Sequence, residues 1–166
     1  MQPQLIIILL ISCIGAIFDW KYRKIPNWLT FGTFFICILF YLFQMDFKGI
    51  LNCSLGFFAG LGLLIIFYLL GGMGAGDVKL LGAVGSIVGY KEVLLIFIYS
   101  GLSGVILVLL AIMFSPSKLK FLITTGQLSP IVDKKEKIPY GIAIFMGTIF
   151  YIIFNPGNLF GFHLWQ

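Results

Sequence analysis

The sequence predicts an all-α membrane protein, a bundle of about six transmembrane helices with both termini outside, forming one domain over residues 1–166. Composition is the first observation behind this prediction. Hydrophobic residues make up 60% of the chain and charged residues 10%, with a mean hydropathy of +1.09, whereas soluble domains are nearer half apolar and a quarter charged. A chain this short has too much surface for its volume to bury that excess, so lipid must solvate much of it. The second observation is that apolar runs alternate with short polar segments.

Each expected span is an apolar run bounded by polar residues or glycines. The six runs cover residues 5–18, 28–43, 51–70, 78–88, 93–114 and 138–154. A polar loop at 19–27 separates the first two runs, and a turn with Asp46 and Lys48 separates the second from the third. The glycine-rich stretch 71–76 precedes the short fourth run, and the longest polar segment, 115–137, precedes the sixth.

The basic residues give these spans an orientation. All but two of the 11 Lys and Arg residues lie in the segments that follow the first, third and fifth spans, and the exceptions are Lys48 and Lys91. Loops rich in Lys and Arg stay in the cytoplasm, so these segments are expected there and both termini outside. No basic residue precedes Phe18, as a signal peptide would require, so the first span is expected to be retained. The net charge of +5 then predicts contact with anionic lipids, and no nucleic-acid partner is expected.

Two pairs of glycines predict close packing between helices. Gly56 and Gly60 are spaced as GxxxG, and so are Gly85 and Gly89. Small residues at this spacing let the backbones of membrane helices approach closely. The spacing therefore predicts a packed bundle around the third and fourth spans.

The three cysteines, Cys13, Cys37 and Cys53, form no CxxC pair and lie in or beside apolar runs. This spacing does not predict a zinc site, and buried cysteines usually act as small hydrophobes. No metal and no other cofactor is therefore expected.

Asp19 and Asp77 are the residues that point to chemistry. Asp19 follows the first span and Asp77 precedes the fourth, so both are expected on the cytoplasmic side at a similar depth. An acidic residue at membrane depth is costly and usually functional, although an ordinary boundary charge in the headgroup region is the alternative. Asp77 also follows the motif glycines Gly74 and Gly76, which permit irregular backbone, and such backbone at membrane depth lines a wet cavity or other protein.

Two carboxylates that share one water can hydrolyse a peptide bond. The ionised carboxylate takes a proton from water, while the protonated one binds the scissile carbonyl and later protonates the leaving amine. Close carboxylates cannot easily both ionise, so the pair holds one proton. Asp77, near a helix N-terminus, is expected to start as the base, and Asp19, near a C-terminus, as the acid.

At these residues the chain resembles a known family. Residues 74–77 read GAGD and match the GxGD motif of intramembrane aspartyl proteases. The segments 72–80, GMGAGDVKL, and 19–27, DWKYRKIPN, resemble type IV prepilin peptidases, and 138–141, IPYG, is similar to a third element of that family. The larger members of the family have an N-terminal methylating domain with a cysteine cluster, which this sequence lacks, so it looks like the short form.

The resemblance implies an aspartic endopeptidase of the prokaryotic inner membrane, active in type IV pilus assembly or protein secretion. Its partner would be a prepilin or prepilin-like protein, whose leader peptide it cleaves at the cytoplasmic face. The resemblance implies Asp19 and Asp77 as the catalytic pair and Gly74 and Gly76 as motif glycines. Lys79, Pro139 and Gly141 are implied as structural neighbours of the site.

Two other classes of function remain open from the residues alone. Intramembrane acids also serve as proton relays, and helices broken by glycine line transport sites, so Asp19 and Asp77 could belong to a small transporter or channel subunit. A non-catalytic assembly factor is the third candidate. An aspartate pair at one membrane face favours hydrolysis, whereas an acid at the midplane favours transport.

Overall fold

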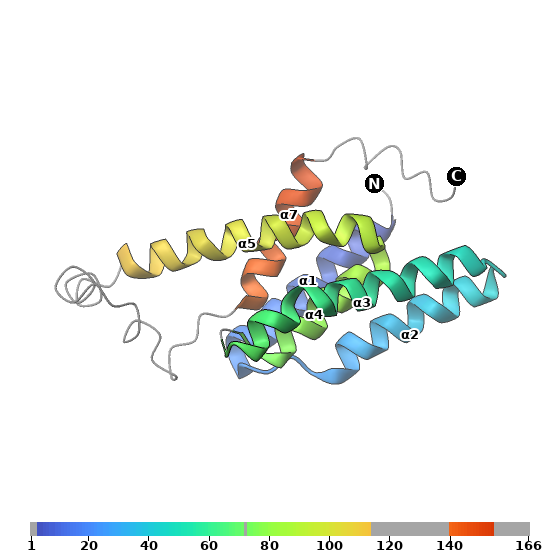
Figure 1. Cartoon of the computed structure of the whole chain (residues 1–166), viewed down its shortest axis with the longest axis horizontal. Helices are drawn as coiled ribbons and strands as arrows, with labels where there is room; N and C mark the ends of the chain where they lie inside the picture. Colours follow the sequence, from blue (N-terminus) through green and yellow to red (C-terminus); the bar gives the residue numbers. More distant parts are fainter. Residues whose placement is uncertain (1–2, 72, 114–139, 155–166) are drawn as a thin grey trace.

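The computed structural model describes residues 3–71, 73–113 and 140–154, and the ordered elements in these ranges are helices (Figure 1). They are α1 (Pro3–Tyr22), α2 (Asn27–Phe43), α3 (Phe47–Leu69), α4 (Ala75–Val88), α5 (Tyr90–Met113) and α7 (Tyr140–Phe154). The predicted all-α membrane bundle is confirmed, and each expected span corresponds to one of these helices. The segment 115–137 and Pro139 lie outside the described residues.

The helices differ in whether they are long enough to cross a membrane. By length and composition, α1, α3 and α5 qualify, and α2 and α7 are apolar but shorter. α4 has 14 residues. The described residues thus form six helices, as expected, but only three of these helices are long and apolar enough to cross a membrane by this measure.

Several helices extend beyond the apolar runs that locate them. α1 continues through Asp19 to Tyr22, and α4 begins at Ala75 rather than at 78. α3 begins at Phe47, where Asp46 is the N-cap and its Oδ1 accepts a hydrogen bond from the N–H of Gly49 at 3.1 Å. Hydropathy marks the part of a helix that lies in lipid or in the protein core, whereas capping bonds and backbone geometry determine where the helix ends.

α4, the shortest of the described helices, is enclosed by protein. It contacts each of the other described helices, and most of its residues between Asp77 and Val88 are buried. Leu80, Leu81 and Val84 have no exposed surface and belong to the hydrophobic core. α4 is thus the centre of the bundle, around which the long helices are arranged.

The predicted glycine packing is confirmed between α3 and α4. A Cβ placed at Gly56 or at Gly85 would collide with the backbone oxygen of the other residue, and one at Gly60 would lie 2.6 Å from the carbonyl oxygen of Leu81. Gly89 ends α4 with φ +92° and lies against the side chain of Asn52. Because these neighbours are mostly backbone atoms, the contact leaves no room for a side chain.

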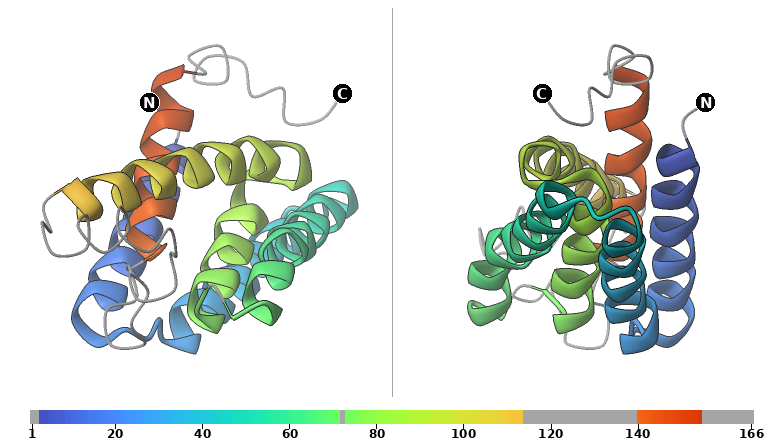
Figure 2. Two further views of the ribbon diagram at one scale, coloured as in Figure 1. Left: turned by 60° about the vertical axis from the view of Figure 1, so that its left-hand side comes forward. Right: turned by 90° about the vertical axis from the view of Figure 1, so that its right-hand side faces the viewer.

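α7 packs against α1 and α5 through small and hydroxyl residues. The hydroxyls of Ser12 and Thr148 lie 3.1 Å apart, and both side chains are fully buried. Gly147 lies directly against Ser100 of α5, which crosses α7 at a steep angle in each view (Figures 1 and 2). Hydrogen bonds and close backbone approach of this kind hold membrane helices together in lipid.

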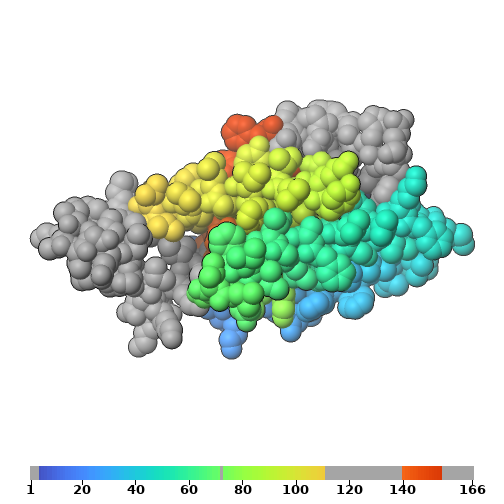
Figure 3. All heavy atoms as spheres, viewed as in Figure 1, coloured from blue at the N-terminus to red at the C-terminus, as the bar shows by residue number. Residues whose placement is uncertain are grey.

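The outer faces of α2, α3 and α5 carry large apolar side chains. Figure 3 shows one such face, which α3 and α5 form together. Exposed members include Phe35, Ile36, Phe43, Phe58, Ile66, Ile98, Leu102 and Leu109. Because exposing so large an apolar surface to water is unfavourable, this is the surface that contacts lipid.

Two of the cysteines are closer than their separation in sequence suggests. The thiols of Cys37 on α2 and Cys53 on α3 lie close enough to interact. The Sγ of Cys37 also donates to the carbonyl oxygen of Ser86 on α4 at 3.1 Å. Cys53 is 1% exposed, in line with its expected role as a small core residue.

Candidate functional site

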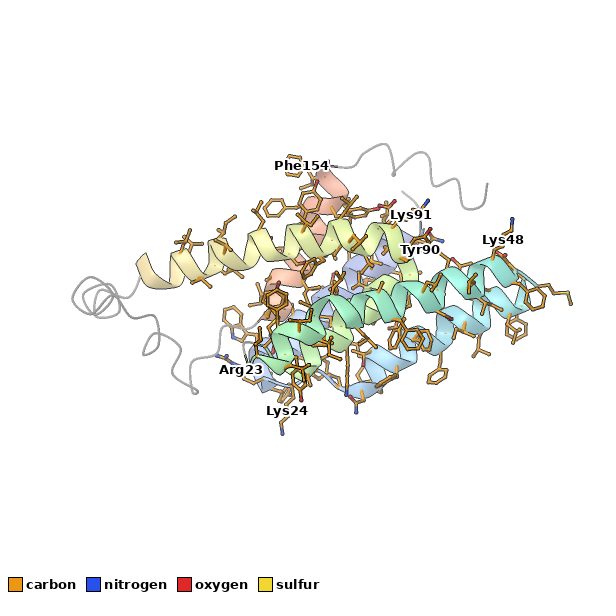
Figure 4. The ribbon with its side chains drawn as sticks, in the orientation of Figure 1. Arg23, Lys24, Lys48, Tyr90, Lys91 and Phe154 are labelled. Carbon is orange, nitrogen blue, oxygen red and sulfur yellow. The ribbon has the colours of Figure 1, made fainter. Side chains whose placement is uncertain are left out.

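Three helix ends gather on one side of the bundle. α1 ends there, and α4 and α7 begin there (Figure 1). We call this side the site end. Arg23 and Lys24 lie at the site end, whereas Lys48 and Lys91 lie at the opposite end (Figure 4). Among the labelled residues, the basic side chains are thus separated as the sequence predicted.

The contact between α1 and α4 brings Asp19 and Asp77 to facing surfaces. A Cβ placed at Gly15 would lie 2.6 Å from Cδ1 of Leu80, so the two helices are in close contact at this level. Asp19 lies one helical turn beyond Gly15, and Asp77 lies about one turn before Leu80. Because α1 runs toward the site end and α4 runs away from it, both steps lead the same way (Figure 2). The two aspartates therefore occupy the next level of the same interface.

Asp19 lies inside the last turn of α1 and is held by α7. Its side chain is 8% exposed, and its Oδ2 accepts a hydrogen bond from the N–H of Gly141 at 2.9 Å. A Cβ placed at Gly141 would lie 2.9 Å from Cβ of Asp19 and 3.1 Å from its Oδ2. Glycine at 141 is therefore what lets the α7 backbone reach the carboxylate.

α1 ends just after Asp19 in a left-handed turn. Arg23 has φ 54°, and its N–H donates to the carbonyl oxygen of Asp19 at 2.9 Å. A 5→1 bond of this type closes the C-terminus of a helix. The guanidinium of Arg23 is also close enough to attract the Asp19 carboxylate electrostatically. The basic residues that follow Asp19 thus help to define its surroundings as well as the topology.

Asp77 lies in the first turn of α4 and is held by its own helix. Its side chain is 5% exposed, and its Oδ2 accepts a hydrogen bond from the N–H of Gly74 at 3.2 Å. In return, the N–H of Asp77 donates to the carbonyl oxygen of Gly74 at 3.2 Å. Gly74 is the N-cap of α4, so the motif places the acid at the third helical position, where a carboxylate reaches back to the N-cap backbone.

The other motif glycine, Gly76, lies where the segment after Asp19 meets the segment before Asp77. A Cβ placed there would lie 3.1 Å from Cβ of Ile25 and 3.2 Å from its backbone nitrogen. Ile25 is buried in the connection between α1 and α2. The segment that follows Asp19 therefore packs directly on the segment that precedes Asp77.

Lys79 supports the same junction and does not face the carboxylates. Its Nζ donates a hydrogen bond to Oδ1 of Asn27 at 3.0 Å and lies 5.5 Å from the ring centroid of Phe31. Both partners belong to the first turns of α2. Of the three expected neighbours of the site, Gly141 contacts Asp19 directly, whereas Lys79 contacts α2 and neither aspartate. Pro139 lies outside the described residues.

Tyr140 is a further member of the site, and its residue type alone gave no indication of this. It is the first residue of α7 and is half-buried against the core. The charge of Asp77 acts on its hydroxyl, while the next residue, Gly141, binds Asp19. Its place in the IPYG segment was the available signal, but only the packing of α7 reveals its nearness to Asp77.

The site thus contains two buried carboxylates on contacting helices, and Oδ2 of each accepts a hydrogen bond from a backbone N–H. Two carboxylates that reach one water can exchange protons with it. Within the described ranges, no group of three or more His, Cys, Asp or Glu side chains is placed to bind a metal ion.

Comparison with known proteins gives one match. A model of the type IV leader peptidase family matches residues 5–109, which is more than half of the chain. The matched region contains Asp19, Gly74, Gly76, Asp77 and Lys79, and it ends before Gly141. No curated protein and no solved structure matches the chain.

Proposed function

We propose that this chain, which belongs to the type IV leader peptidase family, is an aspartic endopeptidase that cleaves the leader peptide of prepilin-like proteins at the cytoplasmic membrane face. Asp19 and Asp77 are the catalytic pair. The proposal depends on one observation. Asp19 and Asp77 lie on the two sides of the α1–α4 interface, each about one helical turn from the contact of Gly15 with Leu80 and toward the site end. Membership of the family supports a peptidase, and the geometry supports these two carboxylates as its reacting groups.

The reaction needs one proton shared between the two acids. Asp77 starts ionised, because it lies in the first turn of α4, where the helix dipole stabilises negative charge. It removes a proton from water as the water oxygen bonds to the scissile carbonyl carbon. Asp19 starts protonated and hydrogen-bonds the carbonyl oxygen, then transfers its proton toward the leaving amine as the carbon–nitrogen bond breaks.

The substrate class follows from the family and the location of the site. The acids lie at the ends of helices, at the site end of the bundle, where Arg23 and Lys24 also lie (Figure 4). By the positive-inside rule this end faces the cytoplasm. A peptidase there acts on a bond near the membrane surface, which suits a leader peptide that precedes a hydrophobic helix.

The location also separates this proposal from a transporter or proton-relay subunit. A relay needs acids along a path through the membrane, and transport sites commonly lie near the midplane. Asp19 and Asp77 lie in the last turn of one helix and the first turn of another. Their position supports chemistry at one face.

The test is processing of a precursor by the purified protein in liposomes. The substrate is a prepilin-like protein from the same cell, with its leader intact. Wild type is expected to release the mature form, whereas Asp19→Asn and Asp77→Asn leave the precursor uncut. Asp46→Asn is the matched control, because Asp46 caps α3 away from the pair and Asn caps a helix equally well. Normal processing by either of the first two variants would refute the proposal, and so would an intact precursor after incubation with wild type.

A further inference from the structure

Tyr140 connects the two halves of the acid pair. Its backbone is fixed on the Asp19 side, because the N–H of Gly141 donates to Oδ2 of Asp19 at 2.9 Å. Its side chain packs against the buried core, to which α4 contributes Leu80 and Leu81, and its hydroxyl is within the electrostatic influence of Asp77. The residue therefore starts beside one carboxylate and ends near the other.

The ring of Tyr140 has a defined position. It lies against Gly104 of α5, where an added Cβ would be 3.0 Å from Cε2 and 3.8 Å from Cδ2 of the ring. It also packs against the buried core of the bundle. A side chain at 104 would therefore press on the ring. α5 thus leaves room for the ring and limits its movement, which is what a hydrogen-bond donor needs in order to act without reorganisation.

The phenol is a suitable group at this place. Its O–H is a neutral donor, and beside an ionised carboxylate it neither adds charge nor needs a counterion. Peptide hydrolysis creates negative charge on the scissile carbonyl oxygen, and a preorganised donor aimed at that oxygen lowers the barrier. Of the two carboxyl groups, only the protonated one can donate to it.

We propose that Tyr140 is a third catalytic residue, whose hydroxyl donates a hydrogen bond to the scissile carbonyl oxygen alongside protonated Asp19. The bond strengthens as the carbonyl oxygen becomes negative in the tetrahedral intermediate and weakens again when the carbonyl re-forms. No proton leaves Tyr140, and no other bond forms or breaks at it. This role rests on the proposed peptidase function and adds to it a donor that the acid pair alone does not provide.

The test compares Tyr140→Phe with wild type in the liposome assay. The substitution removes the hydroxyl and keeps the ring that packs on Gly104, so the unfolding temperature in detergent should stay close to that of wild type. We expect kcat to fall about a hundredfold, as for the loss of one oxyanion donor, with little change in KM. Tyr90→Phe makes the same chemical change at an exposed residue at the opposite end and should cleave as wild type does (Figure 4).

A second variant tests the ring position. Gly104→Ala keeps the hydroxyl but presses on the ring, and kcat is expected to fall several-fold, less than in Tyr140→Phe. An unchanged kcat in Tyr140→Phe would overturn the inference, and a fall that appears only in KM would also do so, because it would indicate substrate binding alone.

The two proposals fail in different ways. If wild type cleaves the precursor and the aspartate variants do not, the peptidase proposal stands whatever Tyr140→Phe does. If wild type does not cleave, both proposals are overturned.

Discussion

Asp19 and Asp77 are both buried and both bound by a backbone N–H, but the donors have different origins. Asp77 is bound by Gly74, three residues earlier in the same helix cap. Asp19 is bound by Gly141, 122 residues later and on another helix. The Gly74 bond of Asp77 is therefore local to its motif, whereas the Gly141 bond of Asp19 depends on how α7 docks. Changes that loosen α7 should act on the Asp19 side of the site first.

The largest effect of this difference is expected for Gly141→Ala. The new Cβ would lie within 3.1 Å of both Cβ and Oδ2 of Asp19, so the carboxylate or α7 must move. A misplacement of about 1 Å can cost roughly a hundredfold in rate, and we expect cleavage of the precursor to fall by about that factor. Gly101→Ala is the control, since a Cβ there meets nothing within 4 Å. Wild-type cleavage by Gly141→Ala would show that Asp19 does not depend on this contact.

A smaller effect is expected where α7 meets α1 further from the site. Thr148→Val keeps the shape of the side chain but removes the hydroxyl that lies 3.1 Å from that of Ser12. Such bonds between membrane helices contribute about 0.6 kcal/mol on average, so the unfolding temperature in detergent should fall slightly. Cleavage should fall a few-fold, because the Gly141 N–H then holds Asp19 less firmly. A rate loss equal to that of Gly141→Ala would contradict a role limited to docking.

On the Asp77 side, Gly74→Ala should be milder than Gly141→Ala. Gly74 is exposed and has φ −83° and ψ 148°, which alanine adopts without strain, and its N–H remains available to Asp77. The added Cβ would lie 3.3 Å from Oδ2 of Asp77, so the carboxylate must yield slightly. We expect cleavage to fall by no more than about fivefold, since alanine is also a somewhat poorer N-cap than glycine. A loss as large as that of Gly141→Ala would show that the local cap is as sensitive as the contact with α7.

The smallest effect is expected for Lys79→Gln. Lys79 bonds to Asn27 at an exposed position and not to either acid. Glutamine can still donate to the same oxygen, and exposed bonds of charged side chains contribute little. Cleavage and unfolding temperature should both stay close to those of wild type. A loss of cleavage comparable with that of Asp77→Asn would indicate that Lys79 takes part in the reaction.

The surroundings of Asp77, which include a contact within its own helix cap, were easier to predict from the sequence than those of Asp19. Glycine spacing and an acid after the cap indicated both the break before α4 and the importance of Asp77. The start of α4 was nevertheless expected at 78 and lies at Ala75, because the N-cap bonds of Gly74 continue the helix beyond the apolar run. The Gly56, Gly60 and Gly85 packing was predictable for the same reason, since small residues at fixed spacing mark a helix face.

The contacts between residues far apart in the sequence could not be predicted in the same way. Nothing in the spacing of residues shows that Gly141 donates to Asp19, because that contact depends on the packing of α1, α5 and α7. The position of Tyr140 near Asp77 and the meeting of Cys37 with Cys53 likewise depend on how helices cross. The resemblance of the IPYG segment indicated the neighbourhood of Gly141, but not the bond it makes.

The central claim is that Asp19 and Asp77 act as one unit, and the most direct test is the additivity of their losses. Residual cleavage is measured over long incubations for Asp19→Asn, Asp77→Asn and the double variant. Groups that share one reaction step lose almost everything when either is removed, so the double variant should be no slower than the slower single variant. If the two losses multiply, or if one single variant cleaves as wild type does, the carboxylates do not work as a pair.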